Sequence, residues 1–224
     1  MSIVLSARHI QKVYKTLSGD VPALNDVSYD FEEGHFYAIV GRSGSGKSTL
    51  LHILGSLDKP TGGQIWVNGK DISTMSDRER AAFRRRSVGF VFQQFNLLEE
   101  YNVKTNICLP LKLDGKKTDW IFFNEIVDIL GLREKLNKYP SELSGGEQQR
   151  VAIARSVLAK PKIIIADEPT GNLDQKTGES TISLLMDCAA RFGQTLIIVT
   201  HNPEIAEKAD VVLKIEDGRL YTDR

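Results

Sequence analysis

The chain has 224 residues, enough for one compact domain with a substantial core, and its 29 basic and 29 acidic side chains cancel to a formal net charge of zero. No net field therefore draws the protein toward nucleic acid or anionic lipid, and we expect no nucleic-acid partner. No apolar run approaches the roughly 18 residues of a membrane span, and the two cysteines, Cys108 and Cys188, stand without a His or Cys at metal-ligand spacing, which favours buried thiols in a reducing cytosol.

Antiparallel strands are predicted for the first 35 residues. Val27, Tyr29 and Phe31 alternate with polar residues, which is the period of a half-buried strand. Tyr14 precedes this segment and lies on no periodic apolar face. By position alone, its ring either packs in the core or stacks on a nucleotide base.

A glycine-rich stretch follows the apolar run Phe36–Val40 and leads into a helical pattern that begins near Ser48. Its spacing is that of a P-loop, in which backbone N–H groups close around a polyphosphate. Lys47 would reach the β and γ phosphates, the Ser48 hydroxyl could ligate Mg²⁺, and the helix N-terminus adds positive dipole. A dinucleotide-binding fingerprint is one alternative, but it would need a glycine at the position of Thr49. An ordinary glycine-rich turn is another alternative, and the flanking strand and helix disfavour it. The residues predicted to surround the phosphates are Gly41, Arg42, Ser43, Gly44, Ser45, Gly46, Lys47, Ser48 and Thr49.

A hairpin and another helix are predicted after the P-loop helix. The dipeptide Asn68-Gly69 marks a tight hairpin turn at the end of a predicted strand. Ser76 and Glu79 have the spacing of a capping box and should open a helix. The basic run 84–86 is either a binding patch or, as we favour, a solvated face or end of this helix.

The apolar run 88–92 predicts a strand that ends at Gln93. Ligands lie at the carboxyl ends of the strands in an open α/β sheet, so Gln93 either faces a ligand or is an ordinary polar residue between strand and loop. The pattern then becomes mainly helical. Thr118-Asp119 can cap a helix that ends at Gly131, and we expect its apolar stripe to form the core of a helical subdomain. The stripe consists of Trp120, Ile121, Phe123, Val127 and Leu130.

A pair of glycines opens the next predicted helix. Ser144 and Glu147 alone would make a capping box. A capping box does not require the two consecutive glycines Gly145 and Gly146. Without side chains, they would let the backbone at the positive end of the helix approach an anion. This stretch is therefore a candidate second phosphate site, well separated along the chain from the first.

Strands and helices alternate again beyond residue 160, which predicts a parallel sheet covered on both faces, with the helical block as an insertion. Asp167 and Glu168 directly follow the apolar run 163–166. An Asp at a strand end beside a P-loop typically holds Mg²⁺ directly or through water, and an adjacent Glu can orient and deprotonate an attacking water. The alternative, a pair of helix-capping acids, is weakened by Pro169.

Together these stretches resemble the ATP-binding-cassette (ABC) ATPases across essentially the whole chain. The resemblance rests on the P-loop, on LSGGEQQR at 143–150, on IIIADEPTGNLD at 163–174 and on His201 after a strand. Within that family, FVFQQFNLL at 90–98 and the compact length resemble the MacB, lipoprotein-release (LolD) and FtsE-like group.

The resemblance implies roles for particular residues. Tyr14 would stack on adenine, Gln93 would sense Mg²⁺ and the membrane partner, and His201 would contact the γ-phosphate. Ser144, Gly145 and Gly146, with Glu147 beside them, would close on ATP held by the other subunit of a head-to-tail dimer. That dimer is expected to be a homodimer with two competent sites, and the alternative is a pair with a different ATPase chain. Residues 172–174 would lie between the two sites. The expected catalytic residues are thus Lys47, Gln93, Glu168 and His201, and the expected Mg²⁺ ligands are Ser48, Gln93 and Asp167.

We therefore expect a P-loop NTPase (RecA-like) α/β core with an N-terminal antiparallel β subdomain and an inserted α-helical subdomain. Residues 1–224 would form a single nucleotide-binding domain, in which 95–159 are the helical subdomain and 1–94 and 160–224 are the rest. With ATP and Mg²⁺ it would be the motor subunit of a membrane transporter or extrusion complex, located in the cytoplasm on the inner face of the cell membrane through a separate permease. The alternative is an FtsE-like regulator that acts through a membrane partner on cell-wall hydrolases without transport.

Phe95, Leu97 and Leu98 follow Gln93 in a segment without a helical or strand period. These side chains either fold back into the helical subdomain or form the floor of a groove for a partner helix. We favour the groove, because a motor without a membrane span needs an apolar dock.

Overall fold

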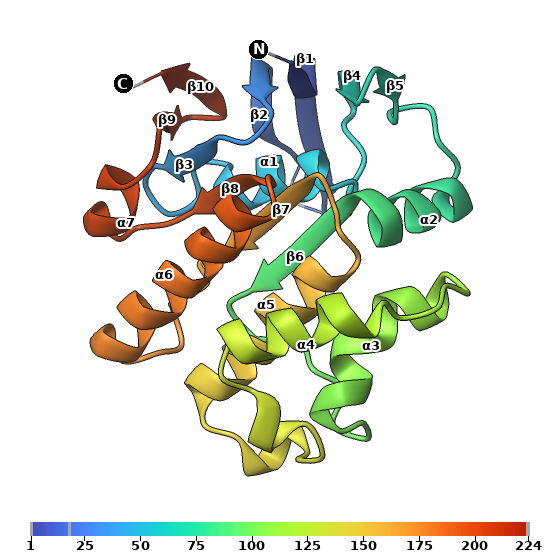
Figure 1. The fold of residues 1–224 in the computed structure, drawn as a ribbon. Coiled ribbons are helices and arrows are strands. Elements are labelled where there is room, and N and C mark those ends of the chain that lie inside the picture. Colours follow the sequence, from blue (N-terminus) through green and yellow to red (C-terminus); the bar gives the residue numbers. More distant parts are fainter. Residues whose placement is uncertain (1, 18, 223–224) are drawn as a thin grey trace. The chain divides into compact units, whose positions relative to one another are not determined.

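The computed structural model describes residues 2–17 and 19–222, which pack as two compact units. The first unit holds the chain up to Arg84 and again from Ile197 onward, and the second holds Arg85–Leu196. The chain passes between the units within helix α2 and within strand β8 (Figure 1). Among the described residues, no helix combines the length and the apolar character that crossing a bilayer requires.

The first unit contains an antiparallel sheet with the strand order β2-β1-β4-β5. Val27 and Phe31 of β2 are buried and Tyr29 between them is half-buried, in line with the predicted alternation, and Leu24 is buried as well. The turn between β4 and β5 places Asn68 and Gly69 at φ 48° and 73°, the left-handed conformation that this dipeptide favours, so the predicted hairpin is confirmed. The strands are β1 (Ile3–Thr16), β2 (Gly19–Glu32), β4 (Gly62–Val67) and β5 (Lys70–Asp71).

Further strands of the first unit lead to the P-loop. β3 pairs in parallel with β9, and β9 pairs with β10 in antiparallel fashion. Ile39 of β3 and its partner Leu213 of β9 are both fully buried, so this strand pair forms part of the core. The elements are β3 (Phe36–Val40), α1 (Lys47–Leu54), α7 (Pro203–Glu207), β9 (Val211–Glu216) and β10 (Arg219–Thr222).

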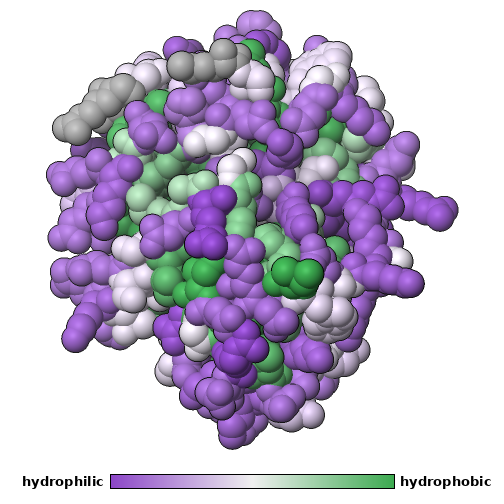
Figure 2. Space-filling model, viewed as in Figure 1, coloured by the Kyte–Doolittle hydropathy of each residue, from purple (hydrophilic) through white to green (hydrophobic). Residues whose placement is uncertain are grey.

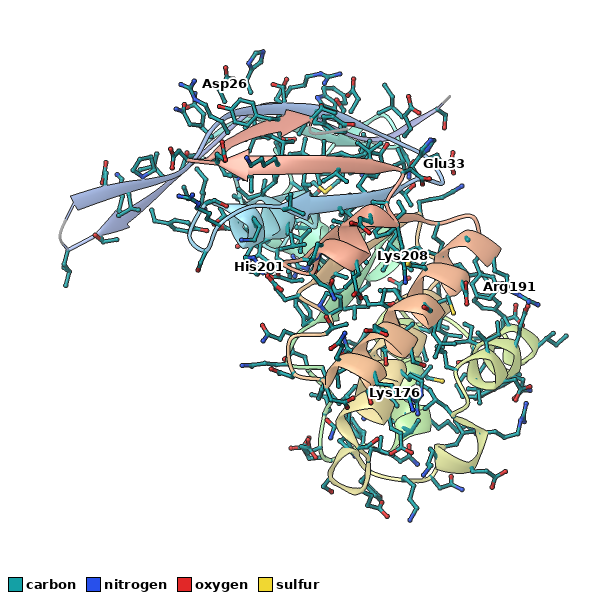
Figure 3. All side chains as sticks on the ribbon, turned by 90° about the vertical axis from the view of Figure 1, so that its left-hand side faces the viewer. Asp26, Glu33, Lys176, Arg191, His201 and Lys208 are labelled. Carbon is teal, nitrogen blue, oxygen red and sulfur yellow. The ribbon has the colours of Figure 1, made fainter. Side chains whose placement is uncertain are left out.

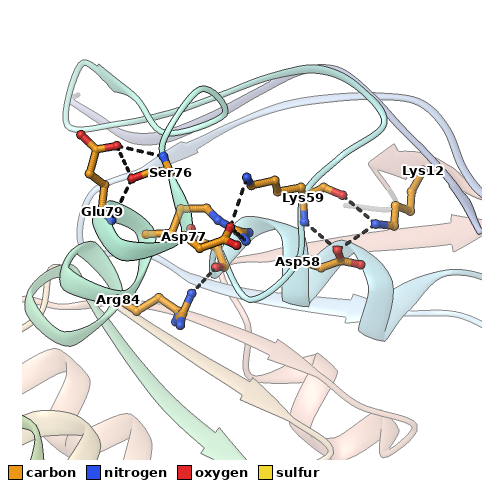
Figure 4. Close-up of polar contacts among 9 residues, drawn as sticks. Lys12, Asp58, Lys59, Ser76, Asp77, Glu79 and Arg84 are labelled. Atoms are coloured by element: carbon orange, nitrogen blue, oxygen red, sulfur yellow. Dashed lines mark hydrogen bonds and ion pairs between the residues drawn. The ribbon is translucent and has the colours of Figure 1, made fainter.

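Helix α2 (Asp77–Ser87) begins at the predicted capping box. The Ser76 N–H donates to Glu79 Oε2 at 2.8 Å, and the Glu79 N–H donates to Ser76 Oγ at 3.4 Å (Figure 4). The basic run 84–86 lies in the last turn of this helix, where Arg84 donates to the Ser56 carbonyl at 2.8 Å. The favoured interpretation of that run, a helix end, is confirmed.

The second unit contains the parallel pair of strands β6 and β7, covered by helices. Gly89 of β6 lies against helix α5, because a Cβ at Gly89 would stand 2.5 Å from the Ser156 carbonyl oxygen. Both cysteines are free thiols buried in this unit, as predicted. The elements are β6 (Val88–Phe92), α3 (Val103–Leu113), α4 (Trp120–Ile129), the 3₁₀ turns η1 (Arg133–Lys135) and η2 (Pro140–Glu142), α5 (Gly145–Leu158), β7 (Ile163–Asp167), α6 (Gln175–Arg191) and the start of β8 (Thr195–Val199).

Helix α4 begins where the sequence predicts, because Asp119 accepts a hydrogen bond from the Phe122 N–H at 3.1 Å. The prediction that its whole apolar stripe is buried is wrong. Trp120 is 51% exposed and Ile121 is 85% exposed. Trp120 packs edge-on against the buried Phe123 and lies beneath the Lys104 ammonium, whereas Ile121 is one residue further around the helix and points away from the core.

Candidate functional site

The P-loop of the first unit needs glycine at both of its ends. A Cβ at Gly41 would stand 2.3 Å from the Ile215 carbonyl oxygen, and a Cβ at Gly46 would stand 2.5 Å from the Ala23 carbonyl oxygen. Gly46 also has φ 108°, which side chains rarely permit. Because a glycine occupies the N-cap of α1, no side chain at that position covers the first N–H groups of the helix. The loop therefore presents backbone donors at a positive helix end.

Lys47 is the first residue of α1, and only 6% of its surface is exposed. Its Nζ donates to the Gly41 carbonyl at 3.0 Å and to the Arg42 carbonyl at 2.9 Å. The ammonium thus lies folded over the backbone of its own loop, where phosphate oxygens are predicted to compete for it. Of its neighbours in the loop, Arg42 and Ser48 are exposed and Thr49 is half-buried.

His201 and the first P-loop glycine line one cavity of the first unit. The cavity measures about 400 Å³ and is lined by Gly41, Thr200, His201 and Asn202 among others. The residue before His201 is tied to β3, because the Thr200 N–H donates to the Ile39 carbonyl at 3.2 Å. The residue after it caps α7, and Figure 3 shows His201 beside that helix. Gly41 and His201 therefore share a pocket, and the contact of His201 with the γ-phosphate stays a prediction.

Tyr14 lies on β1 with 38% of its surface exposed. Its hydroxyl donates to Asp58 Oδ2 at 3.0 Å, and Lys12 Nζ lies 4.8 Å from the ring centroid and 2.8 Å from Asp58 Oδ1 (Figure 4 shows the Lys12–Asp58 pair). Burial raises the pKa of Asp58, but the hydrogen bonds from Lys12, the Lys59 N–H and Tyr14 outweigh it and lower the pKa overall. The ring is thus tethered to the segment that follows α1, and its stacking on adenine stays a prediction.

In the second unit, the loops after β6 and β7 are joined by a reciprocal amide pair. Gln93 Nε2 donates to Asn172 Oδ1 at 3.1 Å, and Asn172 Nδ2 donates to the Gln93 carbonyl at 2.9 Å. Asp167, the last residue of β7, is in register with Phe92 at the end of β6. Gln93 and Asp167 are therefore both found at the carboxyl ends of neighbouring parallel strands, where ligands of α/β sheets lie.

Glu168 follows Asp167 with a left-handed backbone, at φ 46°. A residue with a Cβ adopts this conformation only where its surroundings impose it, and such strain concentrates at functional sites. Its carbonyl accepts a hydrogen bond from the Gly171 N–H at 3.0 Å, which closes a tight turn after the strand. The strained turn supports the prediction that Glu168 has a chemical role, although no pattern in the sequence indicates the strain.

The N-terminus of α5 is a complete capping box, as predicted. The Ser144 N–H donates to Glu147 Oε2 at 2.8 Å, and the Glu147 N–H donates to Ser144 Oγ at 3.4 Å. Lys135 Nζ lies 2.9 Å from Glu147 Oε1, and this pair together with the hydrogen bonds from Ser144 lowers the pKa of Glu147 to about 2. The carboxylate is thus ionised and neutralised within its own unit at physiological pH.

The two glycines of α5 have different surroundings. A Cβ at Gly145 would meet Leu173 Cδ2 at 3.2 Å, whereas a Cβ at Gly146 would stand 2.4 Å from Thr177 Cγ2 of α6. A side chain at position 146 would therefore force Thr177 of α6 to move, independently of any phosphate. Sequence reasoning attributed both glycines to anion approach and missed this packing constraint.

Sequence reasoning also missed two residues further along α5. Gln149 is fully buried, and its Nε2 donates to the Pro169 carbonyl at 2.7 Å and to the Phe92 carbonyl at 3.4 Å. Arg155 donates to the carbonyls of Phe95 and Asn96. No sequence signal identifies these contacts, since each joins segments that are far apart in the chain.

The donor atoms predicted for Mg²⁺ suit that ion. Ser48 offers a hydroxyl, Gln93 an amide oxygen and Asp167 a carboxylate, and Mg²⁺ prefers oxygen ligands, commonly one or two carboxylates with substrate phosphates and water. Among the described residues, no cluster of three or more His, Cys, Asp or Glu side chains could hold a metal by itself. The chemistry of each predicted donor therefore suits Mg²⁺, and their joint binding of the ion stays a prediction.

The chain is similar to known proteins over nearly its whole length. The family model described as "ABC transporter" matches residues 24–171. The chain is 43% identical to an uncharacterized ABC transporter ATP-binding protein, MJ1508, of Methanocaldococcus jannaschii, over 97% of each chain. It is 42% identical to the lipoprotein-releasing system ATP-binding protein LolD of Bordetella pertussis, over 98% of this chain and 96% of that protein.

A solved structure is also closely similar. It is the dimeric post-hydrolysis state of the ATP-binding cassette MJ0796 bound to ADP and Pi, with 37% identity, coverage of 98% of this chain and 99% of that chain, and a TM-score of 0.88. These similarities confirm the resemblance stated from the motifs and the predicted α/β P-loop fold with its antiparallel β subdomain. The chain therefore belongs to the ABC transporter family and is one of its ATPases.

Proposed function

We propose that this ATPase is the motor subunit of a membrane transporter or extrusion complex of the lipoprotein-release type. The observation that carries the proposal is the P-loop, in which glycines are sterically required and a buried Lys47 faces the loop backbone. Near-complete alignment with a relative named as a lipoprotein-releasing ATP-binding protein favours transport over regulation of cell-wall hydrolases. The protein would act at the membrane through a separate permease.

The proposed chemistry is in-line attack of water on the γ-phosphate of ATP. Lys47 and the backbone of the P-loop would hold the β and γ phosphates, Tyr14 would stack on adenine, and His201 would contact the γ-phosphate. Ser48, Gln93 and Asp167 would hold Mg²⁺, which supplies positive charge to the β and γ oxygens. Glu168 would orient the attacking water and take its proton.

ATP would couple to movement by joining two copies of the chain. Ser144, Gly145 and Gly146, with Glu147 holding the cap, would close on ATP held by the P-loop of a second copy. The γ-phosphate would then contact both copies, so ATP favours the closed dimer and hydrolysis removes that preference. The similar cassette is a dimer with ADP and Pi bound, which supports the pairing of two copies around nucleotide and implies that separation follows the loss of Pi.

Ser144→Arg tests the shared site. A long cation where backbone must meet phosphate is expected to block ATP-driven dimerisation and turnover, while fluorescent-nucleotide binding to the variant's own P-loop stays intact. Mixing Ser144→Arg with Lys47→Ala should restore part of the turnover, because the heterodimer then has one site with neither defect. Ser141→Arg, at an exposed position of η2, is the matched control and should behave like the unmodified chain. Absence of recovery in demonstrated heterodimers would argue for a site within one chain or for obligatory coupling of the two sites.

The proposed contact with the permease involves the segment after Gln93. Leu98 is 40% exposed, although its backbone N–H and carbonyl are both held by the buried Asn106 side chain at 2.8 and 3.0 Å. Phe95 and Leu97 are half-buried. Hydrophilic residues cover most of the face drawn in Figure 2, with hydrophobic residues visible between them in several places.

In the segment after Gln93, a fixed backbone that carries one exposed and two half-buried apolar side chains suits a docking floor for an apolar partner helix.

Leu98→Asp is expected to abolish co-purification with the membrane protein and any stimulation by it, while the isolated variant keeps its fold and its ATP binding. A charge in an apolar interface lacks a partner, which disfavours binding. Leu113→Asp is the control, since Leu113 is 63% exposed at the end of α3 and lies outside the proposed dock. If Leu98→Asp instead unfolds the isolated chain, the side chain belongs to the core and the dock lies elsewhere.

A further inference from the structure

The segment that follows Gln93 has a strained backbone. Phe95 and Asn96 have φ 46° and 51°, so two successive residues with side chains adopt the left-handed conformation. That conformation is uncommon for any residue other than glycine and is especially unfavourable for a bulky one such as Phe. Such a backbone persists only where its surroundings over-determine it, so something must hold this segment.

Arg155 of α5 fixes this segment through two hydrogen bonds. Its Nη2 donates to the Phe95 carbonyl at 2.7 Å, and its Nη1 donates to the Asn96 carbonyl at 2.5 Å. The rigid fork of a guanidinium suits two neighbouring acceptors, and a lysine ammonium does not reproduce this geometry. The strained pair of residues is therefore bridged by one side chain.

The position of Arg155 is unusual for a cation. The side chain is half-buried, and desolvation lowers its pKa to about 10, which still leaves it protonated at neutral pH. No carboxylate in the described part of the chain forms an ion pair with it. Desolvating a charge without a counter-ion is unfavourable, so the charge is retained for its contacts with the two carbonyls.

Other contacts fix the same segment on its preceding side. Gln149, also on α5, donates to the Phe92 carbonyl, and Gln93 forms the reciprocal pair with Asn172. The ring of Phe95 lies near the start of α5, since a Cβ at Gly145 would stand 3.7 Å from Phe95 Cζ. Helix α5 thus contacts the segment 92–96 at both ends, through Gln149 at the start and Arg155 at the end, and Gln93 lies between these two contacts.

We propose that Arg155 is a positioning residue for ATP hydrolysis: by bridging the Phe95 and Asn96 carbonyls it imposes the left-handed turn that fixes the direction of Gln93. The inference rests on the proposed role of Gln93 at the Mg²⁺ ion and the partner. Arg155 would touch neither the nucleotide nor the attacking water. Its loss should therefore lower kcat and leave the KM for ATP nearly unchanged.

The test combines Arg155→Met with a second change at Asn96. Methionine keeps the length of the side chain and removes every donor, and we expect kcat to fall about tenfold or more, as for a misplaced catalytic group. Amide hydrogen exchange in residues 93–98 should become faster. Asn96→Gly should restore much of kcat to the Arg155→Met chain, because glycine adopts positive φ without a Cβ penalty. Arg155→Lys should retain the fold and recover only part of kcat, because one ammonium cannot hold both carbonyls in the same geometry.

Matched controls separate this role from general stabilisation. Asp217→Gly removes another left-handed residue, at φ 47° in the turn between β9 and β10, and should not rescue Arg155→Met. Arg191→Met removes an exposed arginine of α6 that pairs with Glu125 at 2.7 Å, and should leave kcat unchanged (Figure 3 labels Arg191). An unchanged kcat in Arg155→Met, or equal rescue by Asp217→Gly and Asn96→Gly, would overturn the proposal.

Failure of the proposed function has a different signature. If Gln93→Ala keeps full turnover while Arg155→Met still speeds exchange in residues 93–98, Arg155 holds the turn but the role of Gln93 is wrong, and the positioning proposal falls with it. If Gln93→Ala lowers kcat while Arg155→Met changes neither kcat nor exchange, the proposed function stands and only the inference about Arg155 fails.

Discussion

Lys47→Ala is expected to abolish ATP turnover. The loop holds its ammonium 3.0 Å from the Gly41 carbonyl and 2.9 Å from the Arg42 carbonyl, and this ammonium is predicted to bind the β and γ phosphates. Loss of a single preorganised donor to developing charge commonly lowers kcat by about 10² to 10³, and loss of a full positive charge should exceed that. Phosphate release at saturating ATP measures the effect.

The control for this variant is Lys208→Ala, which removes an exposed lysine that follows α7. It should hydrolyse ATP at the unmodified rate. Turnover of Lys47→Ala within a few-fold of the unmodified chain would contradict the P-loop assignment and the functions derived from it.

Glu168→Gln is expected to slow hydrolysis by about 10² to 10⁴ while ATP binding is retained, since a positioned general base typically contributes that much. Glutamine keeps the size of the side chain and the strained turn at φ 46°, but it cannot take the proton of the attacking water. Single-turnover hydrolysis and fluorescent-nucleotide binding separate the two effects. Glu179→Gln, at an exposed position of α6, is the control. Lost ATP binding in Glu168→Gln would show a structural role instead.

Local signals in the sequence located several helix starts and one hairpin turn. The capping boxes at Ser76 and Ser144 and the cap at Asp119 each lie at the start of a helix in the structure. Such signals succeed because a cap satisfies backbone N–H groups within a few residues, so its energetics are contained in a short stretch of sequence. The tight turn at Asn68-Gly69 was predictable for the same reason.

Contacts between distant segments could not be predicted in this way. Arg155 bridges carbonyls of residues 59 and 60 positions earlier in the chain, and no periodic pattern connects them. The need for glycine at 146 arises from Thr177 on another helix. Exposure of Ile121 depends on how far the core extends around α4, which hydrophobic periodicity alone does not determine. The left-handed turn at Glu168 is likewise imposed by its surroundings.

The shared nucleotide site is tested most directly by the molar mass of Glu168→Gln in solution, measured by light scattering. With ATP and Mg²⁺ the variant should be a dimer, because the unhydrolysed γ-phosphate contacts both copies, and with ADP it should be a monomer. Adding Ser144→Arg to the same chain should abolish the ATP-bound dimer without loss of bound nucleotide. A monomer in ATP and Mg²⁺, with one nucleotide bound per chain, would contradict the account.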